Sequence, residues 1–112
     1  MELTITEHIV RINIIAPQGR IDAFCTPELR KQFEVLLGKN EIKFILDLSA
    51  VTFLDSAGMA ALVSLLKAAR EAGGDVKLVW PKEEAAQRIL RLTRFDRVFD
   101  IADNQKAALS SF

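Results

Sequence analysis

Apolar and polar positions along the chain follow two periods, one typical of strands and one typical of helices. Near the N-terminus, positions 3 and 5 and most of positions 9–15 are apolar, and Glu7-His8 interrupts the partial period-two alternation. This pattern predicts two strands joined by a tight turn. Residues 44–48 form an apolar run with one acid, which is typical of a strand buried on both faces of a sheet. Residues 76–80 predict a further strand.

Other segments repeat apolar residues every three to four positions and predict helices. Thr26-Pro27-Glu28 supplies an N-cap, a proline at the first helical position and an acid, and Gly38 ends this helix. A second helix, rich in Ala, Leu and Met, is expected from 55 to 72, and a third over 83–92. A short buried segment near the C-terminus leads into a final helix.

The order of these elements predicts an α/β fold. We expect a single domain over residues 1–112, with a four- to five-stranded mixed sheet and about four helices packed on it. The second helix is so apolar that most of its circumference must be covered by protein, either its own or a partner's.

Composition excludes several classes of function. Fifteen basic and fifteen acidic residues give no net charge, which disfavours a basic surface for nucleic acid. One Cys and one His cannot form a disulfide or a Cys/His zinc site, so we expect no metal, no cofactor and no enzyme activity. Residues 57–66, the longest central stretch without a charge, are too short to span a membrane, and the Met1-Glu2-Leu3-Thr4 start lacks a signal-peptide pattern. The expected location is the cytoplasm.

The segment Asp55-Ser56-Ala57-Gly58 is the first candidate for function. It follows the predicted central strand and begins the most apolar helix, where free N–H groups favour an anion. The alternative is structural, with Asp55 or Ser56 as the helix N-cap and Gly58 allowing close packing.

Other polar residues favour structural roles. Asp47, an acid inside an apolar strand, is best explained as a hydrogen-bonded strand-end residue. Cys25 and His8 are each isolated, and we assign both to structure. Four arginines recur every three residues and are interpreted as a solvated helix face, in which Glu84 is placed to pair with the first of them: Arg88, Arg91, Arg94 and Arg97.

Three segments together carry a resemblance to a known family. Residues 44–59, which include Asp55-Ser56-Ala57-Gly58, resemble the signature of STAS domains of the bacterial anti-sigma factor antagonist family. Gly19-Arg20-Ile21-Asp22 resembles the Gly-x-Leu-Asp element of that family, and residues 92–99 resemble its closing segment. The likeness extends over essentially the whole chain.

The resemblance implies a switch controlled by phosphorylation. The unphosphorylated protein would bind a serine-kinase anti-sigma factor and release a sigma factor, and the kinase would then phosphorylate Ser56 and end the interaction. A PP2C-type phosphatase would restore the active form, with no direct nucleic-acid contact and no membrane insertion. The implied partner-binding residues are Asp22, Asp55, Ser56, Ala57, Gly58 and Met59.

Some alternatives remain open at this point. Asp22 either shapes the partner surface or is a turn acid that hydrogen-bonds the backbone. Ala57 stands where many family members have a second hydroxyl, so Ser56 is the only candidate within the motif, with Ser49 and Thr52 as fallback sites. The alternative function is a constitutive STAS subunit of a larger assembly, such as a lipid-transport complex or a signalling scaffold, docked through the apolar second helix.

Overall fold

A computed structural model describes all 112 residues of the chain. Its elements in chain order are β1 (Asn13–Ile15), β2 (Gly19–Ile21), α1 (Thr26–Gly38), β3 (Lys43–Asp47), β4 (Val51–Leu54), α2 (Ser56–Glu71), β5 (Asp75–Val79), α3 (Glu84–Leu92), α4 (Phe95–Val98), β6 (Asp100–Ala102) and α5 (Gln105–Ser110). The α/β class and the positions of the principal helices agree with the sequence analysis.

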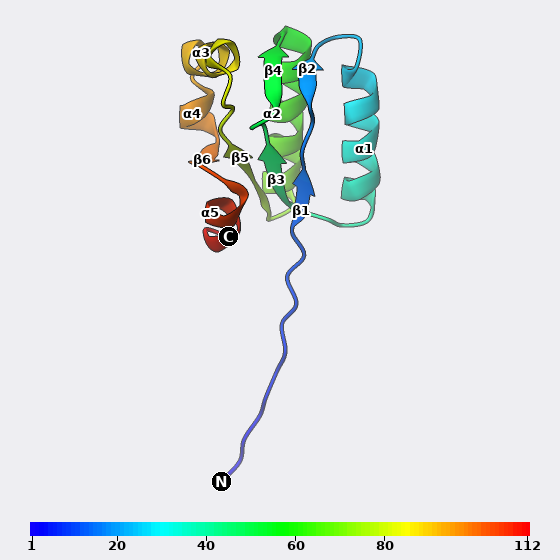
Figure 1. Cartoon of the computed structure of the whole chain (residues 1–112). Helices are drawn as coiled ribbons and strands as arrows, with labels where there is room; N and C mark the ends of the chain where they lie inside the picture. Colours follow the sequence, from blue (N-terminus) through cyan, green and yellow to red (C-terminus); the bar gives the residue numbers. More distant parts are fainter.

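The strands form two parallel ladders rather than one mixed sheet. The larger has the order β1-β3-β5-β6, and β2 pairs with β4 in the smaller. As Figure 1 shows, β2 lies beyond β1 and β4 beyond β3, so the smaller ladder extends the larger one at the carboxyl ends of its strands. This extension places the end of β2 beside the start of α2.

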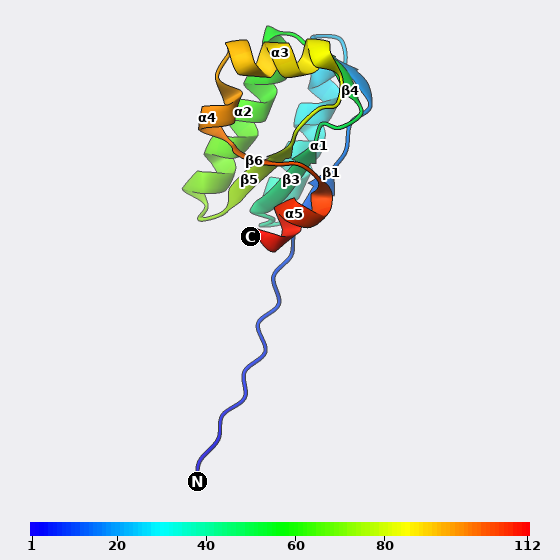
Figure 2. The same ribbon diagram turned by 60° about the vertical axis from the view of Figure 1, so that its left-hand side comes forward.

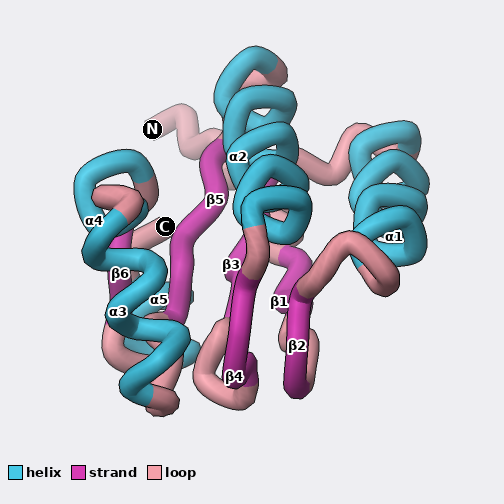
Figure 3. The backbone as a smooth tube through the Cα atoms, turned by 90° about the horizontal axis from the view of Figure 1, so that it is seen from above, coloured by secondary structure: helices cyan, strands magenta, loops and turns pink.

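Helices cover both faces of the larger sheet unequally. The main core joins one face of β3, through Phe44 and Leu46, to buried side chains of α1, α2, α3 and α4. The opposite face of β3 and β5 carries Ile45 and Val79, which pack against Ala108 of α5. Figure 3 shows α1 and α2 together on one side of the strands. The expectation that residues 44–48 form a strand buried on both faces is therefore confirmed.

The fold itself buries more of the second helix, α2, than the composition of this helix suggested. Its buried residues are Gly58, Ala61, Leu62, Leu65, Leu66 and Ala69. Each fully buried leucine side chain contributes about 1.5–3 kcal/mol to folding. Val63 is the one large apolar side chain of α2 that is classed as exposed, at 38 %. Of the two kinds of cover that the sequence left open, the chain's own core or a partner, the chain's own core supplies most.

The predicted N-terminal hairpin is wrong. Residues 1–12 form no regular structure, and the N-terminal part of this segment extends away from the folded body, giving overall dimensions of 61 × 27 × 21 Å (Figures 1 and 2). Its last residues lie against the body, since Arg11 pairs with Glu41 and Ile12 packs on the smaller core cluster. Two-residue hairpin loops favour Gly, Asn or Asp, and Glu7-His8 supplies none of them. Without that hairpin, every strand pair in the molecule is parallel.

The residue types around Thr26 predicted the start of α1 to within one residue. Pro27 lies in the first turn and the helix ends at Gly38, as predicted, but the N-cap is Cys25 and not Thr26. The Thr26 hydroxyl instead donates a hydrogen bond of 2.6 Å to the Asp22 carbonyl, which ties the helix to the preceding loop. None of the helices is both long and apolar enough to cross a lipid bilayer.

Candidate functional site

The candidate site lies where β4 passes into α2. Asp55 has an extended backbone and is the N-cap of α2, because its Oδ1 accepts the N–H of Gly58 at 2.9 Å. The structural alternative for Asp55 is therefore confirmed. Ser56 is the first helical residue, its side chain is exposed, and its hydroxyl makes no hydrogen bond within the protein. The cap thus leaves the serine hydroxyl free at the surface.

Gly58 allows α2 to start close to β2. A Cβ atom at this position would lie 2.4 Å from the Ile21 carbonyl oxygen and 2.9 Å from the Ile21 Cγ2. The same carbonyl accepts the N–H of Asp55 at 3.2 Å. Gly58 is buried, so its role is packing, which confirms that interpretation.

The loop between β2 and α1 lies against this helix start. The Ala23 N–H donates to Oδ2 of Asp55 at 2.8 Å, so one carboxylate holds both the helix and the loop. Asp22 stabilises the loop from the other side, since its Oδ1 accepts the N–H groups of Phe24 at 3.1 Å and Cys25 at 3.3 Å. The prediction that Asp22 bonds the backbone of its own turn is confirmed.

The electrostatics of the site are set by one cation and two carboxylates. The N–H of Gly58 is the largest influence lowering the pKa of Asp55, with further contributions from Ala23, Ala57 and the charge of Arg20. Arg20 lies 3.6 Å from the Asp22 carboxylate and 4.2 Å above the centre of the Phe53 ring. At neutral pH, Asp55 is ionised directly beside the Ser56 hydroxyl.

The structure therefore brings three of the six predicted partner-binding residues to one surface: Asp22, Asp55 and Ser56. Ala57 is half-buried, and Met59 is half-buried against the main core. Neither surface hollow includes Ser56. The larger, of about 560 Å³, lies between residues 8–11 and 39–43, and the other, of about 240 Å³, lies between β2 and α1.

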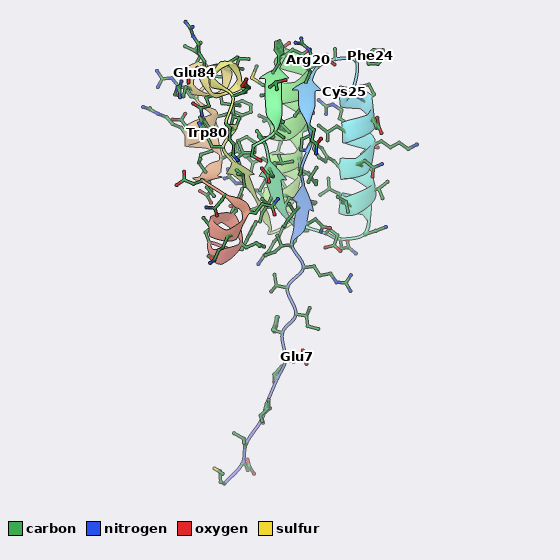
Figure 4. The ribbon with its side chains drawn as sticks, in the orientation of Figure 1. Glu7, Arg20, Phe24, Cys25, Trp80 and Glu84 are labelled. Carbon is green, nitrogen blue, oxygen red and sulfur yellow. The ribbon has the colours of Figure 1, made fainter.

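Sequence reasoning missed the roles of Arg20, Phe24 and Phe53. The contact between Arg20 and Phe53 depends on the pairing of β2 with β4, which sets these two residues opposite each other. A sequence signal existed only for Phe24, an aromatic residue inside a turn of small and polar residues. Figure 4 places Phe24, Cys25 and Arg20 at the same end of the molecule.

Other polar predictions have clear outcomes. Asp47 is buried, and it accepts the N–H of Ser49 at 3.0 Å and the side-chain amide of Gln105 at 2.7 Å, as a satisfied strand-end acid should. Burial raises the pKa of Asp47, but the hydrogen bonds from Ser49 and Gln105 lower it by more. The four arginines are exposed, as expected, but they do not share one helix face, since Arg88 and Arg91 lie in α3 and Arg94 precedes the separate helix α4, which contains Arg97. Glu84 pairs with Arg91 at 3.2 Å rather than with Arg88.

The fold and site define a small α/β domain with a capped helix start that carries an exposed serine. Comparison with known proteins agrees, because the family model for the STAS domain matches residues 3–108. The chain therefore belongs to the STAS domain family, within its anti-sigma factor antagonist branch.

One relative and two solved structures illustrate the likeness. The chain is 30 % identical over 97 residues to the anti-sigma-B factor antagonist of Bacillus subtilis, covering 87 % of this chain and 82 % of the relative. A crystal structure of a candidate anti-sigma factor antagonist from Thermotoga maritima superposes with a TM-score of 0.83 at 31 % identity, covering 89 % of this chain and 86 % of that one. The unphosphorylated anti-sigma factor antagonist SpoIIAA, at 16 % identity and a TM-score of 0.70 with coverage of 89 % and 87 %, shares the fold.

Proposed function

We propose that this protein is an anti-sigma factor antagonist switched by phosphorylation of Ser56. The unphosphorylated form binds a serine-kinase anti-sigma factor and so releases a sigma factor. The kinase transfers the γ-phosphoryl group of ATP to the Ser56 hydroxyl, and a PP2C-type phosphatase hydrolyses the phosphoserine. The protein acts by binding and has no catalytic activity of its own.

One observation carries the proposal: Ser56 is exposed, its hydroxyl is unengaged, and it stands on a helix start fixed by Asp55. A kinase can reach such a hydroxyl without unfolding any part of the chain. The fallback sites are less suitable, since Ser49 is half-buried in the turn after β3 and Thr52 lies within β4. The names of the relatives support the same class of partner.

A phosphate on Ser56 adds about −1.5 to −2 charge at pH 7. It would lie next to the ionised carboxylate of Asp55 and within the influence of one cation, Arg20. A partner surface that accommodates a single carboxylate would then face a concentrated anionic spot, which weakens binding by repulsion and desolvation.

The first experiment is intact-mass analysis of the chain isolated from its native host, with fragmentation to locate any phosphate. The second incubates the purified chain with ATP and each ATP-binding anti-sigma kinase of that host. Ser56→Ala should bind the kinase and resist phosphorylation, whereas Ser56→Asp should bind poorly. Ser64→Asp is the matched control, because Ser64 is exposed on the same helix two turns further on. Equal losses at both positions would show that charge on α2, and not the site, decides binding.

The constitutive-subunit alternative loses its main motivation. It rested on an uncovered apolar surface of α2, and six residues of that helix are instead buried within the chain's own fold. A complex that copurifies with the chain and is indifferent to Ser56→Asp would nevertheless favour it over the switch.

A further inference from the structure

Phe24 is the most exposed large apolar side chain of the folded body. Its exposed fraction is 96 %, and the next highest outside residues 1–10 is 74 %, for Leu92. A phenylalanine buries about 150–250 Å² when it is covered, so exposing one leaves a large apolar area in water. Figure 4 shows it on the loop before α1, at the Arg20 end of the molecule.

The loop that carries Phe24 is held firmly on both sides. Its own N–H donates to Asp22 at 3.1 Å, and the N–H of the preceding Ala23 donates to Asp55 at 2.8 Å. After it, the Thr26 hydroxyl donates to the Asp22 carbonyl at 2.6 Å. A side chain on a backbone ordered in this way loses less entropy when it is covered by a partner.

The Phe24 loop is also hydrogen-bonded to the helix start that carries Ser56. Asp55, the residue before Ser56, hydrogen-bonds the residue before Phe24. A stable protein interface covers about 800 Å² on each partner, a disc of about 16 Å radius. A protein that covers the Ser56 hydroxyl can therefore also reach the adjoining loop that carries Phe24.

We propose that Phe24 is the anchor residue of the kinase interface, entering an apolar pocket on the anti-sigma factor. This inference rests on the proposed function and adds which side chain supplies most of the binding free energy. Asp55 holds the anchor loop and the helix that carries Ser56 with the same carboxylate. We expect a cation at the edge of that pocket, because the half-buried carboxylate of Asp55 lies against the anchor loop.

The test compares three chains as ligands of the kinase that phosphorylates Ser56, by calorimetry without ATP. Phe24→Ala should weaken binding by at least about 30-fold, the size typical of an aromatic hot spot. Phe24→Leu should retain part of the affinity. Leu92→Ala removes the next most exposed large apolar side chain of the folded body, at the end of α3, and should change the dissociation constant less than threefold.

Kinetics supply a second readout. With ATP present, Phe24→Ala should raise KM for this chain and leave kcat near the wild-type value, because Phe24 contributes binding and not chemistry. Circular dichroism should give wild-type thermal unfolding, since the ring is almost free of contacts.

The outcomes separate the two proposals. If the wild-type chain is bound and phosphorylated at Ser56 while Phe24→Ala binds within threefold, the anchor is rejected and the switch stands. If no kinase of the host binds or phosphorylates the wild-type chain, the proposed function fails and the anchor falls with it. If Phe24→Ala converts a dimer of the isolated chain to a monomer in sedimentation, a second copy occupies this surface and the inference is overturned.

Discussion

Replacing Gly58 by Ala should destabilise the fold and move the candidate site. The added Cβ would meet the Ile21 carbonyl oxygen at 2.4 Å and the Ile21 Cγ2 at 2.9 Å, both inside van der Waals contact. The carbonyl is main chain of β2 and cannot rotate away. The first turn of α2 must therefore shift outward, which lengthens the hydrogen bond from Asp55 to the same oxygen.

The magnitude follows from two opposing effects. Overpacking of this kind costs about 1–3 kcal/mol, and contact with backbone places it in the upper half of that range. Alanine gains up to about 1 kcal/mol over glycine from its higher helix propensity. We expect a net loss of about 1–2 kcal/mol, which lowers Tm by about 4–8 °C in a domain of this size.

Thermal and urea unfolding followed by circular dichroism would measure this loss. Gly38→Ala is the control, because Gly38 is the last residue of α1 and no atom lies within 4 Å of its Cβ position. That variant should match or slightly exceed wild-type stability. If Gly58→Ala were as stable as Gly38→Ala, with unchanged amide resonances at Ala23 and Asp55, the close approach of α2 to β2 would be refuted.

Three further changes test other parts of the structure. Because the pKa of Asp47 is lowered in the fold, its contribution to stability is present above about pH 4 and is lost as pH falls through the folded pKa, so Asp47→Asn should flatten the acid limb of Tm against pH. Parallel acid limbs would contradict this assignment. Lys77, whose side chain is 9 % exposed, pairs with Asp100 at 3.2 Å. Asp100→Ala should cost about 1–2 kcal/mol in urea unfolding, while Lys77→Met stays within about 1 kcal/mol of wild type, and the reverse order would refute the pairing argument. Deletion of residues 2–7 should change Tm by less than about 1 °C in calorimetry, since these residues are exposed and form no regular structure; a fall of more than about 5 °C would show that they pack on the body.

The elements predicted correctly are those with strong local signals. The first helix has a proline in its first turn and ends at a glycine, and the observed range is Thr26–Gly38. The strands that were missed, β2 and β4, have three and four residues and pair with each other across a large separation in sequence. No local period marks such short strands, because their stability comes from the ladder they form together.

The candidate site likewise has features that local sequence indicates and features that depend on contacts between distant segments. The helix cap at Asp55 or Ser56 and the packing role of Gly58 follow from residue type and spacing and formed the structural alternative of the sequence analysis; the structure selects Asp55 as the cap. The bond from Ala23 to Asp55 joins residues 32 positions apart, so the contact depends on the register of β2 against β4. The predicted pair of Glu84 with Arg88, which i to i+4 spacing favours, is not formed. Glu84 pairs with Arg91 instead.

The occupied cap changes how a phosphate at Ser56 would act. A helix start offers free N–H groups to an anion, but here the Gly58 N–H is already bonded to Asp55, which is itself anionic. Phosphorylation would raise the combined charge of Asp55 and Ser56 from −1 to about −2.5 or −3, while Asp55 keeps the Gly58 N–H. The signal would therefore be read at the surface by the partner, beside Phe24, and the core behind α2 would stay unchanged. Because an aspartate carries only about half to two thirds of the charge of a phosphoserine, Ser56→Asp should weaken binding less than phosphorylation does.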